Sequence, residues 1–450
     1  MTDTLSPSLA DWLRDYQKDN GPLSRVELFL VDVNGAAKGK WLAPDKAAAY
    51  ANKGLPMPLS VFAQDCWGRD VPGAGLAFGT GDPDGLLFPV EGRYASMPWM
   101  ESASAQVLVT MRDRDGGPAL ADPRGALERV LARYAERGLT PVVATEQEFY
   151  LYKLEDGRPV PPGGSMLRND TCSTDILSQN ARLFDEMFAA FEEQGIPADG
   201  LASEAGPGQF EINLLHRADA LAAADDVVLL KRTVKALARK HGLGATFMAK
   251  PYGEVSGSGM HIHASVLDQA GHNVLAEPDG APSAHLRHAV AGLLSAMPGS
   301  MLIFAPHFNS YRRLRPDAHA PISAGWGIDD RSAAVRVIHA DARSTRIEHR
   351  ISGADVNPYL ALAAMLGAML EGIVAGKEPP APQDPKHPGA GVRLPIEWGA
   401  AIDAFAASPD VEAIFGSRFR NIYLACKKAD RDVFLAEVSA LEYQTYLDLA

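Results

Sequence analysis

Several features that would place this 450-residue chain in a special class are scarce or missing. It has three cysteines and no Cys-x-x-Cys spacing, which argues against a disulfide framework and favours a reducing compartment. No run approaches the ~18 uninterrupted apolar residues that a membrane span needs, and Met1–Ala10 lacks a basic segment followed by an apolar one. We therefore expect a cytoplasmic protein that has no membrane partner.

Positive charge is also in deficit. Lysine and arginine number 43 against 56 acidic residues, so the formal net charge is −13. Phosphate backbones repel a chain of this charge, which makes nucleic acid a poor partner. Apolar residues make up 46% of the chain, enough for a sizeable core in two or three domains or in one large domain with an appendage.

The sequence divides into two parts of different composition. An amphipathic helix at Leu9–Lys18 and a strand at Arg25–Val33 precede a stretch rich in Gly, Pro and Asp, which is typical of short strands and loops. Asp122 then provides the N-cap of a helix, so we predict domains at 1–114 and 115–450. The second part alternates short strands with helices, which indicates an α+β fold. The helices that we expect there lie at 124–137, 180–194, 220–241, 284–296 and 358–374, and 377–395 is expected to be an ordered surface loop.

Two carboxylates share one face of a predicted strand. In Val142–Tyr152, Glu146 and Glu148 are two positions apart and so project from the same side. Their like charges repel, and burying them would raise a pKa or cost stability unless a cation lay between them. A single Glu-x-Glu more often belongs to a solvated face, so the metal-site interpretation depends on whether similar patterns recur.

The pattern does recur in a second predicted strand. Arg346, Glu348 and Arg350 alternate, which places two cations and a carboxylate on one face. Such a row of guanidinium groups is able to hold anions, and its carboxylate is able to hold a cation.

Two further segments carry ligand-type side chains. His261 and His263 show the same two-residue spacing after a Gly-Ser-Gly run that lets backbone approach a ligand closely. His263 either binds a metal or orients its neighbours. Glu204 and Glu211 flank a short Gly-Pro-Gly loop, which allows both carboxylates to return to one site. Each segment alone is a weak signal, but together they predict a polar cavity.

The donor types indicate a hard divalent ion. Carboxylates with histidine and without cysteine pairs favour Mg²⁺ or Mn²⁺, and Mg²⁺ in turn suggests a phosphate. Arg313, Arg331 and Arg336 could clamp a phosphoryl group, although the neighbouring Arg312 would point to the other side of an extended segment. The sequence contains no P-loop and no Gly-x-Gly-x-x-Gly fingerprint opening a βαβ unit, so any nucleotide would rest on strands and metals.

With these segments in this order, the chain resembles the glutamine synthetase family over nearly its whole length. The segments that carry the resemblance are Thr145–Phe149, Glu204–Asn213, Gly257–His263, Asn309–Leu314, Arg331–Arg336, Arg346–Arg350 and Gly353–Tyr359. The resemblance implies an N-terminal β-grasp domain and a C-terminal catalytic domain in which antiparallel strands, wrapped by helices, form a funnel. It also implies a double hexameric ring, a homododecamer in which each active site is completed by the N-terminal domain of the neighbouring subunit.

The resemblance also assigns roles to individual residues. It implies one metal held by Glu148, Glu204 and Glu211, and another held by Glu146, His261 and Glu348. The residues that it implies for glutamate are Gly257, Arg313 and Arg350. The arginines implied for phosphate are Arg331 and Arg336. The nucleotide positions are Ser265, Arg343 and Arg346, and the aspartate facing the amine is Asp65. We expect Asp65, Arg313 and Arg331 to be catalytic, and two or three Mg²⁺ or Mn²⁺ ions to act with ATP.

The activity implied by the resemblance is ATP-dependent amide formation. The γ-carboxylate of L-glutamate attacks the γ-phosphate of ATP to form γ-glutamyl phosphate, from which an amine then displaces phosphate. The amine must lose a proton to become nucleophilic, so its pocket needs a base or a water route.

Departures from the family pattern point to the acceptor. Glutamine synthetases have a flap glutamate that closes over ammonium six positions after the arginine matched by Arg313, and this chain has His319 there. His319 either gates the amine pocket or is an ordinary surface histidine. The segment 377–395 has no tyrosine that could be adenylylated. The runs Gln194–Asp199, Thr246–Tyr252, Asn309–Arg313 and Leu441–Tyr443 resemble the γ-glutamylputrescine synthetase branch more closely.

We therefore expect a ligase that joins glutamate to a polyamine such as putrescine, or to a small alkylamine. Trp67 would help to shape the amine pocket, although a core or oligomer contact is the alternative. The second hypothesis is an ordinary glutamine synthetase that uses ammonium. A third is a homologue that has lost catalysis, which is disfavoured because all six expected metal ligands are present.

Overall fold

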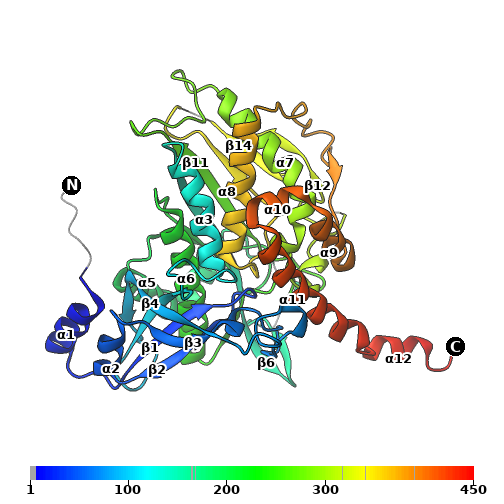
Figure 1. The fold of residues 1–450 in the computed structure, drawn as a ribbon. Helices are drawn as coiled ribbons and strands as arrows, with labels where there is room; N and C mark the ends of the chain where they lie inside the picture. Colours follow the sequence, from blue (N-terminus) through cyan, green and yellow to red (C-terminus); the bar gives the residue numbers. More distant parts are fainter. Residues whose placement is uncertain (1–6, 164–165, 168, 317, 340, 390) are drawn as a thin grey trace.

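The fold begins with a five-stranded sheet. The computed structural model describes residues 7–163, 166–167, 169–316, 318–339, 341–389 and 391–450. The first sheet has the strand order β2-β1-β5-β4-β3, in which β1 and β5 run parallel and the other neighbours are antiparallel. Figure 1 shows this sheet beside α1 (Leu9–Asn20) and α2 (Pro44–Tyr50). Its strands are β1 (Arg25–Val31), β2 (Ala37–Leu42), β3 (Leu55–Pro58), β4 (Asp84–Ser96) and β5 (Ser104–Arg112). The 3₁₀ turns η1 (Leu59–Phe62) and η2 (Pro72–Ala74) connect β3 to β4.

A larger sheet follows in the chain and carries the candidate site. Its path is β13-β14-β15-β11-β6-β9-β8, with β7 and β10 also pairing with β6, and neighbouring strands are antiparallel except for β13 and β14. Its strands are β6 (Thr140–Glu155), β7 (Arg158–Val160), β8 (Ala198–Ser203), β9 (Gln209–Leu214), β10 (Gly244–Thr246), β11 (Met260–Leu267), β13 (Trp326–Ile328), β14 (Val335–Ile338) and β15 (Arg346–His349). A two-stranded ribbon pairs β12 (Ser323–Ala324) with β16 (Val392–Arg393).

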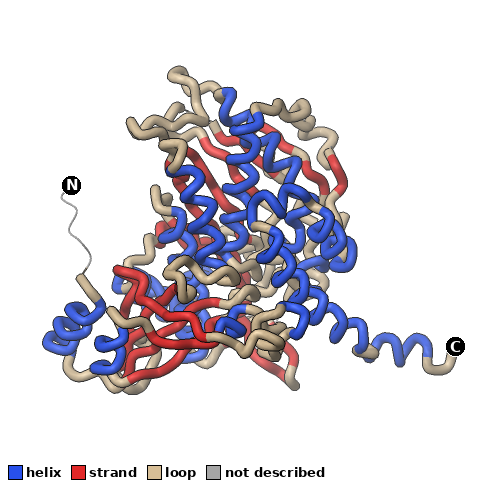
Figure 2. The backbone as a smooth tube through the Cα atoms, in the orientation of Figure 1, coloured by secondary structure: helices blue, strands red, loops and turns tan. Residues whose placement is uncertain are grey.

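Helices cover this larger sheet, as the blue segments in Figure 2 show. They are α3 (Pro123–Ala135), α4 (Thr174–Gln179), α5 (Ala181–Glu193), α6 (Ala220–Lys240), α7 (Ala284–Phe304), the 3₁₀ turn η3 (Phe308–Arg312), α8 (Pro358–Ala375), α9 (Trp398–Ala407), α10 (Pro409–Phe415), α11 (Ser417–Ala436) and α12 (Ala440–Tyr446). Side-chain N-caps mark the starts of two of these helices. The Asp122 carboxylate accepts from Arg124 N at the start of α3, and Asn357 Oδ1 accepts from Tyr359 N at the start of α8. The last helix, α12, projects away from the body (Figure 1).

One helix within the described residues, α8, is long and apolar enough to cross a membrane. However, 78% of this 18-residue stretch is buried inside the fold. A core helix of a globular domain has the same composition, and α8 is enclosed on nearly every side by residues of the hydrophobic core.

Buried polar bonds join the N-terminal sheet to α6. Arg93 of β4 is 8% exposed and contacts Asp226 at 2.8 Å and Asp225 at 3.5 Å. Arg232 of α6 pairs with Glu27 of β1. Because Arg93 and its two aspartates are held out of water, each depends on its partners, and these bonds hold the N-terminal sheet against α6.

Most expected elements are confirmed, and the α+β class is confirmed with them. The helix expected at 284–296 instead continues to Phe304, although Pro298 lies inside it. The proline removes one backbone donor, but the surrounding side chains are buried, so tertiary packing outweighs that loss. The segment 377–395, of which residue 390 lies outside the described residues, is a surface loop apart from β16. Cys66 and Cys172 are exposed, whereas Cys426 is buried. The domain boundary near residue 115 falls between β5 and α3 and stays a prediction.

Candidate active site

Strand register brings the predicted ligands into one row. The Cα partners across neighbouring strands include His261 with Glu146 and Glu148 with Glu211. On the other side of β11, His263 lies opposite Glu348. The two-residue spacing noted in the sequence therefore places these side chains on one face of the sheet, as expected for strands.

Glu146 is the centre of this row. Its two oxygens accept hydrogen bonds from His261 Nδ1 at 2.9 Å and from His263 Nε2 at 3.0 Å. Burial opposes ionisation of Glu146, but the hydrogen bonds from both histidines outweigh it and lower the pKa of the carboxyl. Glu146 is therefore a carboxylate at neutral pH. Arg346 Nε donates to His263 Nδ1 at 3.3 Å, so His263 carries its proton on Nε2.

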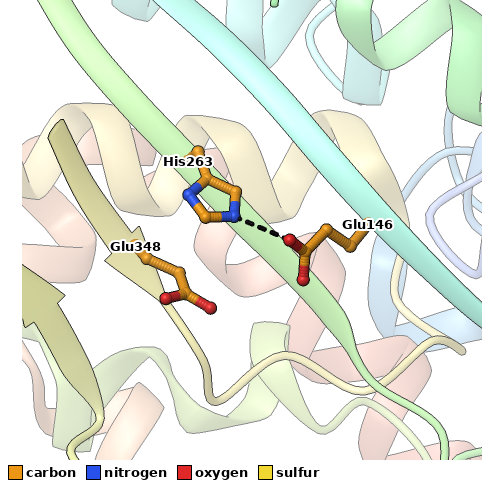
Figure 3. A group of neighbouring side chains, drawn as sticks. All are labelled: Glu146, His263 and Glu348. Atoms are coloured by element: carbon orange, nitrogen blue, oxygen red, sulfur yellow. Dashed lines mark hydrogen bonds and ion pairs between the residues drawn. The ribbon is translucent and has the colours of Figure 1, made fainter. Parts of the chain in front are cut away.

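Two groups of side chains have donor atoms close enough to share a metal ion. In each group, one ligand atom per residue lies within 4.8 Å of the others. The first group is Glu146, His263 and Glu348, whose side chains converge in Figure 3. The second is Glu146, Glu211 and His261. Glu146 belongs to both groups, which suits a pair of neighbouring ions.

Repulsion within the cluster contributes to a raised pKa in two glutamates at the β8–β9 hairpin. Burial and then the charge of Glu148 raise the pKa of Glu204. Burial and the charges of Glu146, Glu148 and Glu204 raise the pKa of Glu211 to about 8. Glu148 itself accepts from Gly259 N at 2.7 Å. Carboxylates that resist ionisation when they are crowded together are suited to binding a cation, which removes their mutual repulsion.

Arginines surround Glu348 on the other side of the cluster. Glu348 is 1% exposed and contacts Arg336 Nη1 at 3.0 Å and Arg350 Nη1. Burial opposes ionisation of Glu348, but the charge of Arg350 and then those of His263 and His261 lower its pKa. Arg336 also pairs with Asp329 at the surface. The row Arg346, Glu348 and Arg350 predicted from the sequence thus places cations next to the carboxylates.

The three residues expected to bind the nucleotide line one cavity. Ser265, Arg343 and Arg346 border a space of about 400 Å³, which Glu146 and His263 also line. The hydrogen bond from Arg346 to His263 connects the cationic part of this cavity with the acidic cluster. A polyphosphate lying in the cavity would meet both the arginines and any ions held by the cluster.

The arginine expected to bind glutamate packs against two glycines. Arg313 is 8% exposed and donates to Ile351 O at 2.7 Å, and burial lowers its pKa. A Cβ on Gly257 would lie 2.8 Å from Arg313 Cγ, and one on Gly259 would lie 2.7 Å from Arg313 Nη2. Only glycine leaves room for the guanidinium beside the cluster, which gives the Gly-Ser-Gly run a physical reason.

Within the described part of the chain, Asp65 and His319 make no hydrogen bond or ion pair to this cluster, and Arg331 contacts it through its backbone carbonyl. Asp65 is 4% exposed, and its carboxylate accepts from Trp67 N, Arg69 N and Arg69 Nε, all in its own loop. His319 is exposed in a loop. Arg331 is exposed, and its carbonyl accepts from Arg350 Nε at 3.1 Å.

Comparison with known proteins places this geometry in a family. Residues 120–446 match the family described as "Glutamine synthetase, catalytic domain". The chain belongs to the glutamine synthetase family. Among relatives of this family member, γ-glutamylputrescine synthetase of Escherichia coli (strain K12) is 40% identical over 413 residues, covering 89% of this chain and 87% of that protein. Glutamate–isopropylamine ligase of a Pseudomonas species is 32% identical, covering 97% of each chain. A solved structure titled "GmaS/ADP complex" is 26% identical, with a TM-score of 0.85 over 97% of this chain and 99% of that one.

The structure adds one site residue, Gln209, that was not predicted from the sequence of this glutamine synthetase family member. Gln209 donates to Glu148 at 3.3 Å and to Gly257 O at 3.0 Å, so it ties the cluster to the glycine run. Its two-residue spacing from Glu211 was the available signal. His263, left open between metal binding and orientation, bonds Glu146 and stands in a candidate metal group.

The donor set of this family member fits the ions expected for it. Carboxylate oxygens and imidazole nitrogens converge there, and the only thiols in the sequence, Cys66, Cys172 and Cys426, lie in other segments. Hard divalent ions such as Mg²⁺ and Mn²⁺ prefer such oxygen-rich surroundings. The raised pKa of Glu211 indicates a site whose charge is unbalanced without a cation.

Proposed function

We propose that this protein is an ATP-dependent ligase that joins the γ-carboxylate of L-glutamate to a primary amine through γ-glutamyl phosphate. The observation that carries the proposal is the connected row of groups on one sheet face. Glu146 lines the arginine-bearing cavity and belongs to both donor groups. At the other end of the row, Arg313 lies next to Gly259. This order suits a nucleotide, two ions and a carboxylate substrate lying side by side.

Each part of the row has a chemical task in this reaction. Arg343 and Arg346, with Ser265, would hold the nucleotide. Arg313 and Arg350, with the Gly257 backbone, would hold glutamate. Arg331 and Arg336 would stabilise the charge that develops on the transferring phosphoryl group. Arg336 and Arg350 are already fixed against Glu348, so they need little reorganisation.

The ions would be held by Glu146, Glu211 and His261 and by Glu146, His263 and Glu348, with Glu148 and Glu204 beside them. When bound, Mg²⁺ or Mn²⁺ would neutralise phosphate oxygens during transfer. We include Glu148 and Glu204 because their carboxylates contribute to the repulsion that raises the pKa of Glu211.

An amine is favoured over ammonium as the acceptor. Three relatives are named as amine ligases, for putrescine, isopropylamine and ethanolamine. His319 stands where the family resemblance expects a carboxylate for ammonium. An exposed imidazole in that place supplies no permanent negative charge. We propose a polyamine such as putrescine or a small alkylamine.

The second candidate is a glutamine synthetase that uses ammonium. The chain is 32% identical to the glutamine synthetase of Thermotoga maritima over 94% of its length, which is the same level as for two of the amine ligases. Identity alone therefore does not separate the two acceptors. A chain without catalysis remains disfavoured, because every expected ligand is present and most converge.

An acceptor panel tests this proposal. Phosphate release is measured with glutamate, ATP and Mg²⁺ against ammonium, methylamine, ethanolamine, putrescine and spermidine. We expect an organic amine to give the highest kcat/KM, and ammonium as the best acceptor would reject the amine assignment. Glu148→Ala should abolish turnover with every acceptor, whereas the matched change Glu155→Ala, at the exposed end of the same strand, should leave it unchanged.

We also propose a cytoplasmic homododecamer of two hexameric rings, in which Asp65 of one subunit approaches the amine site of its neighbour. The apolar side chains of the C-terminal segment support an oligomer, since Leu441, Leu447 and Leu449 are each at least 70% exposed. Light scattering should give about twelve times the 48.1 kDa chain mass. A monomer would exclude shared sites.

A further inference from the structure

A second cavity lies away from the acidic cluster, between the N-terminal sheet and α6. It has a volume of about 540 Å³. One wall is formed by the turn after β1, from Asn34 to Ala37, and by Trp99. The opposite wall is α6, and Phe247 and Asn309, the latter in η3, also line the space. In Figure 1, α6 lies directly above the N-terminal sheet. None of these residues takes part in the proposed reaction.

The α6 wall is strongly cationic. Lys231, Lys235 and Arg239 are each four positions apart, so they follow one face of the helix. A rise of 1.5 Å per residue separates successive members by about 6 Å along the axis. Arg232 also lines the cavity, but Glu27 neutralises it.

Within the described ranges, none of the other three cations forms an ion pair. Lys231 Nζ donates to the carbonyl of Val356 at 3.0 Å, and the Nζ atoms of Lys231 and Lys235 each lie 5.6 Å from the centre of the Phe247 ring. Lys235 and Arg239 are exposed to solvent. Burial and the charge of Lys235 lower the pKa of Lys231 to about 7.

The remaining titratable groups of the cavity do not supply the missing negative charge. Burial and the nearby charges of Lys427 and Lys231 lower the pKa of His307, so this imidazole is neutral. Asp355 is the carboxylate among the lining residues, and it accepts a hydrogen bond from Ser310 Oγ at 2.6 Å. Burial raises the pKa of Asp355 and further weakens it as a counter-charge.

We propose that this cavity binds a small organic anion that carries two or more carboxylate or phosphate groups. A volume of about 540 Å³ is far larger than a single inorganic ion requires and falls in the range of small-molecule sites. The spacing of about 6 Å between successive cations suits two anionic groups at the ends of a short carbon chain. Nucleic acid is excluded as the source, since the chain as a whole has a net charge of −13. Because one wall belongs to the N-terminal sheet and the other to α6, a bound anion would hold the N-terminal sheet against α6.

Trp99 offers a local probe of binding. Glutarate, a dicarboxylate, and inorganic phosphate are titrated separately into the full-length protein with Mg²⁺-ADP present, so that the nucleotide cavity is filled. We expect a saturable change in tryptophan fluorescence that is absent in Trp99→Phe, and a matching heat in calorimetry. Saturation by glutarate supports a carboxylate ligand, and saturation by phosphate supports a phosphorylated one.

The cation variants decide whether α6 holds the anion. The double variant Lys235→Gln, Arg239→Gln should bind at least tenfold more weakly, because two charges are removed from the wall. The matched variant Lys240→Gln lies on the same helix but pairs with Glu186 at 2.9 Å, and it should bind within twofold of the natural protein. Equal affinity in the double variant, or no saturable binding of either anion, would overturn the proposal.

A second measurement shows whether the double variant remains folded. Without anion it should melt at a temperature no lower than that of the natural protein, because the substitutions relieve repulsion between like charges. Binding of glutarate or phosphate should raise the melting temperature of the natural protein only. A rise of equal size in both would also overturn the proposal.

Discussion

The crowding of carboxylates in the candidate active site makes Glu211→Gln a stabilising substitution in metal-free protein. Burial and three neighbouring glutamates raise the pKa of Glu211 from 4.5 to about 8. As pH rises from 4.5 to 8, the unfolded chain releases the proton of this residue while the folded chain retains it. The unfolded state then binds fewer protons, so the free energy of unfolding falls across this window. Glutamine has nearly the same shape and no charge, so the variant should escape this loss.

The size of the effect follows from the raised pKa. One pH unit corresponds to about 1.4 kcal/mol, so the loss is about 3 kcal/mol at pH 7 and below about 1 kcal/mol at pH 5. An unfolding entropy of about 2.1 cal/mol/K per residue gives roughly 0.9 kcal/mol/K for this chain. The gain of the variant should therefore be greater at pH 7 than at pH 5 by at most about 3 °C. Water around the partly exposed carboxyl reduces it toward about 1 °C.

Thermal melting of the chelator-treated protein at pH 5 and pH 7 measures this difference. Glu186→Gln is the matched control, because Glu186 lies at the surface and pairs with Lys240, whose hydrogen bond lowers its pKa. The melting temperature of this control variant relative to the natural protein should be no higher at pH 7 than at pH 5. Addition of Mn²⁺ should stabilise the natural protein more than Glu211→Gln, since the variant lacks one ligand.

Two results would refute this reasoning. If Glu211→Gln melts below the natural protein at pH 7 without metal, Glu211 is not under repulsion. If its gain is the same at both pH values, the effect comes from packing and not from the titration of a carboxyl group.

Three other changes test separate parts of the structure. Gly259→Ala would place a Cβ 2.7 Å from Arg313 Nη2, so KM for glutamate should rise at least tenfold with little change for ATP; steady-state kinetics in which both KM values rise equally would contradict this. Arg346→Ala should raise KM for ATP and weaken ADP binding in calorimetry, because its guanidinium lines the nucleotide cavity; unchanged ADP affinity would remove it from that role. Arg93→Ala should lower the free energy of unfolding by about 1.5 to 3 kcal/mol in denaturant titration, because Asp225 and Asp226 lose one buried partner but keep Arg124 and Arg217. A loss under about 1 kcal/mol would show that the pair is solvated.

The local patterns of the sequence were sufficient to predict most of the framework. The helix expected at 220–241 matches α6, and the cap at Asp122 is present as expected. These features are local, because helical periodicity and capping depend on residues only a few positions apart. Where tertiary packing dominates, local reasoning failed, as in the continuation of α7 through Pro298.

What the sequence by itself determined is which side chains share a strand face. The spacing of Glu146 from Glu148 and of His261 from His263 requires each pair to point the same way once the strands form. What only the tertiary structure decided is how the strands are aligned. Antiparallel register places His261 opposite Glu146, so that one carboxylate bonds both histidines and enters two donor groups. Register depends on contacts between residues more than 100 positions apart, and no local pattern specifies these.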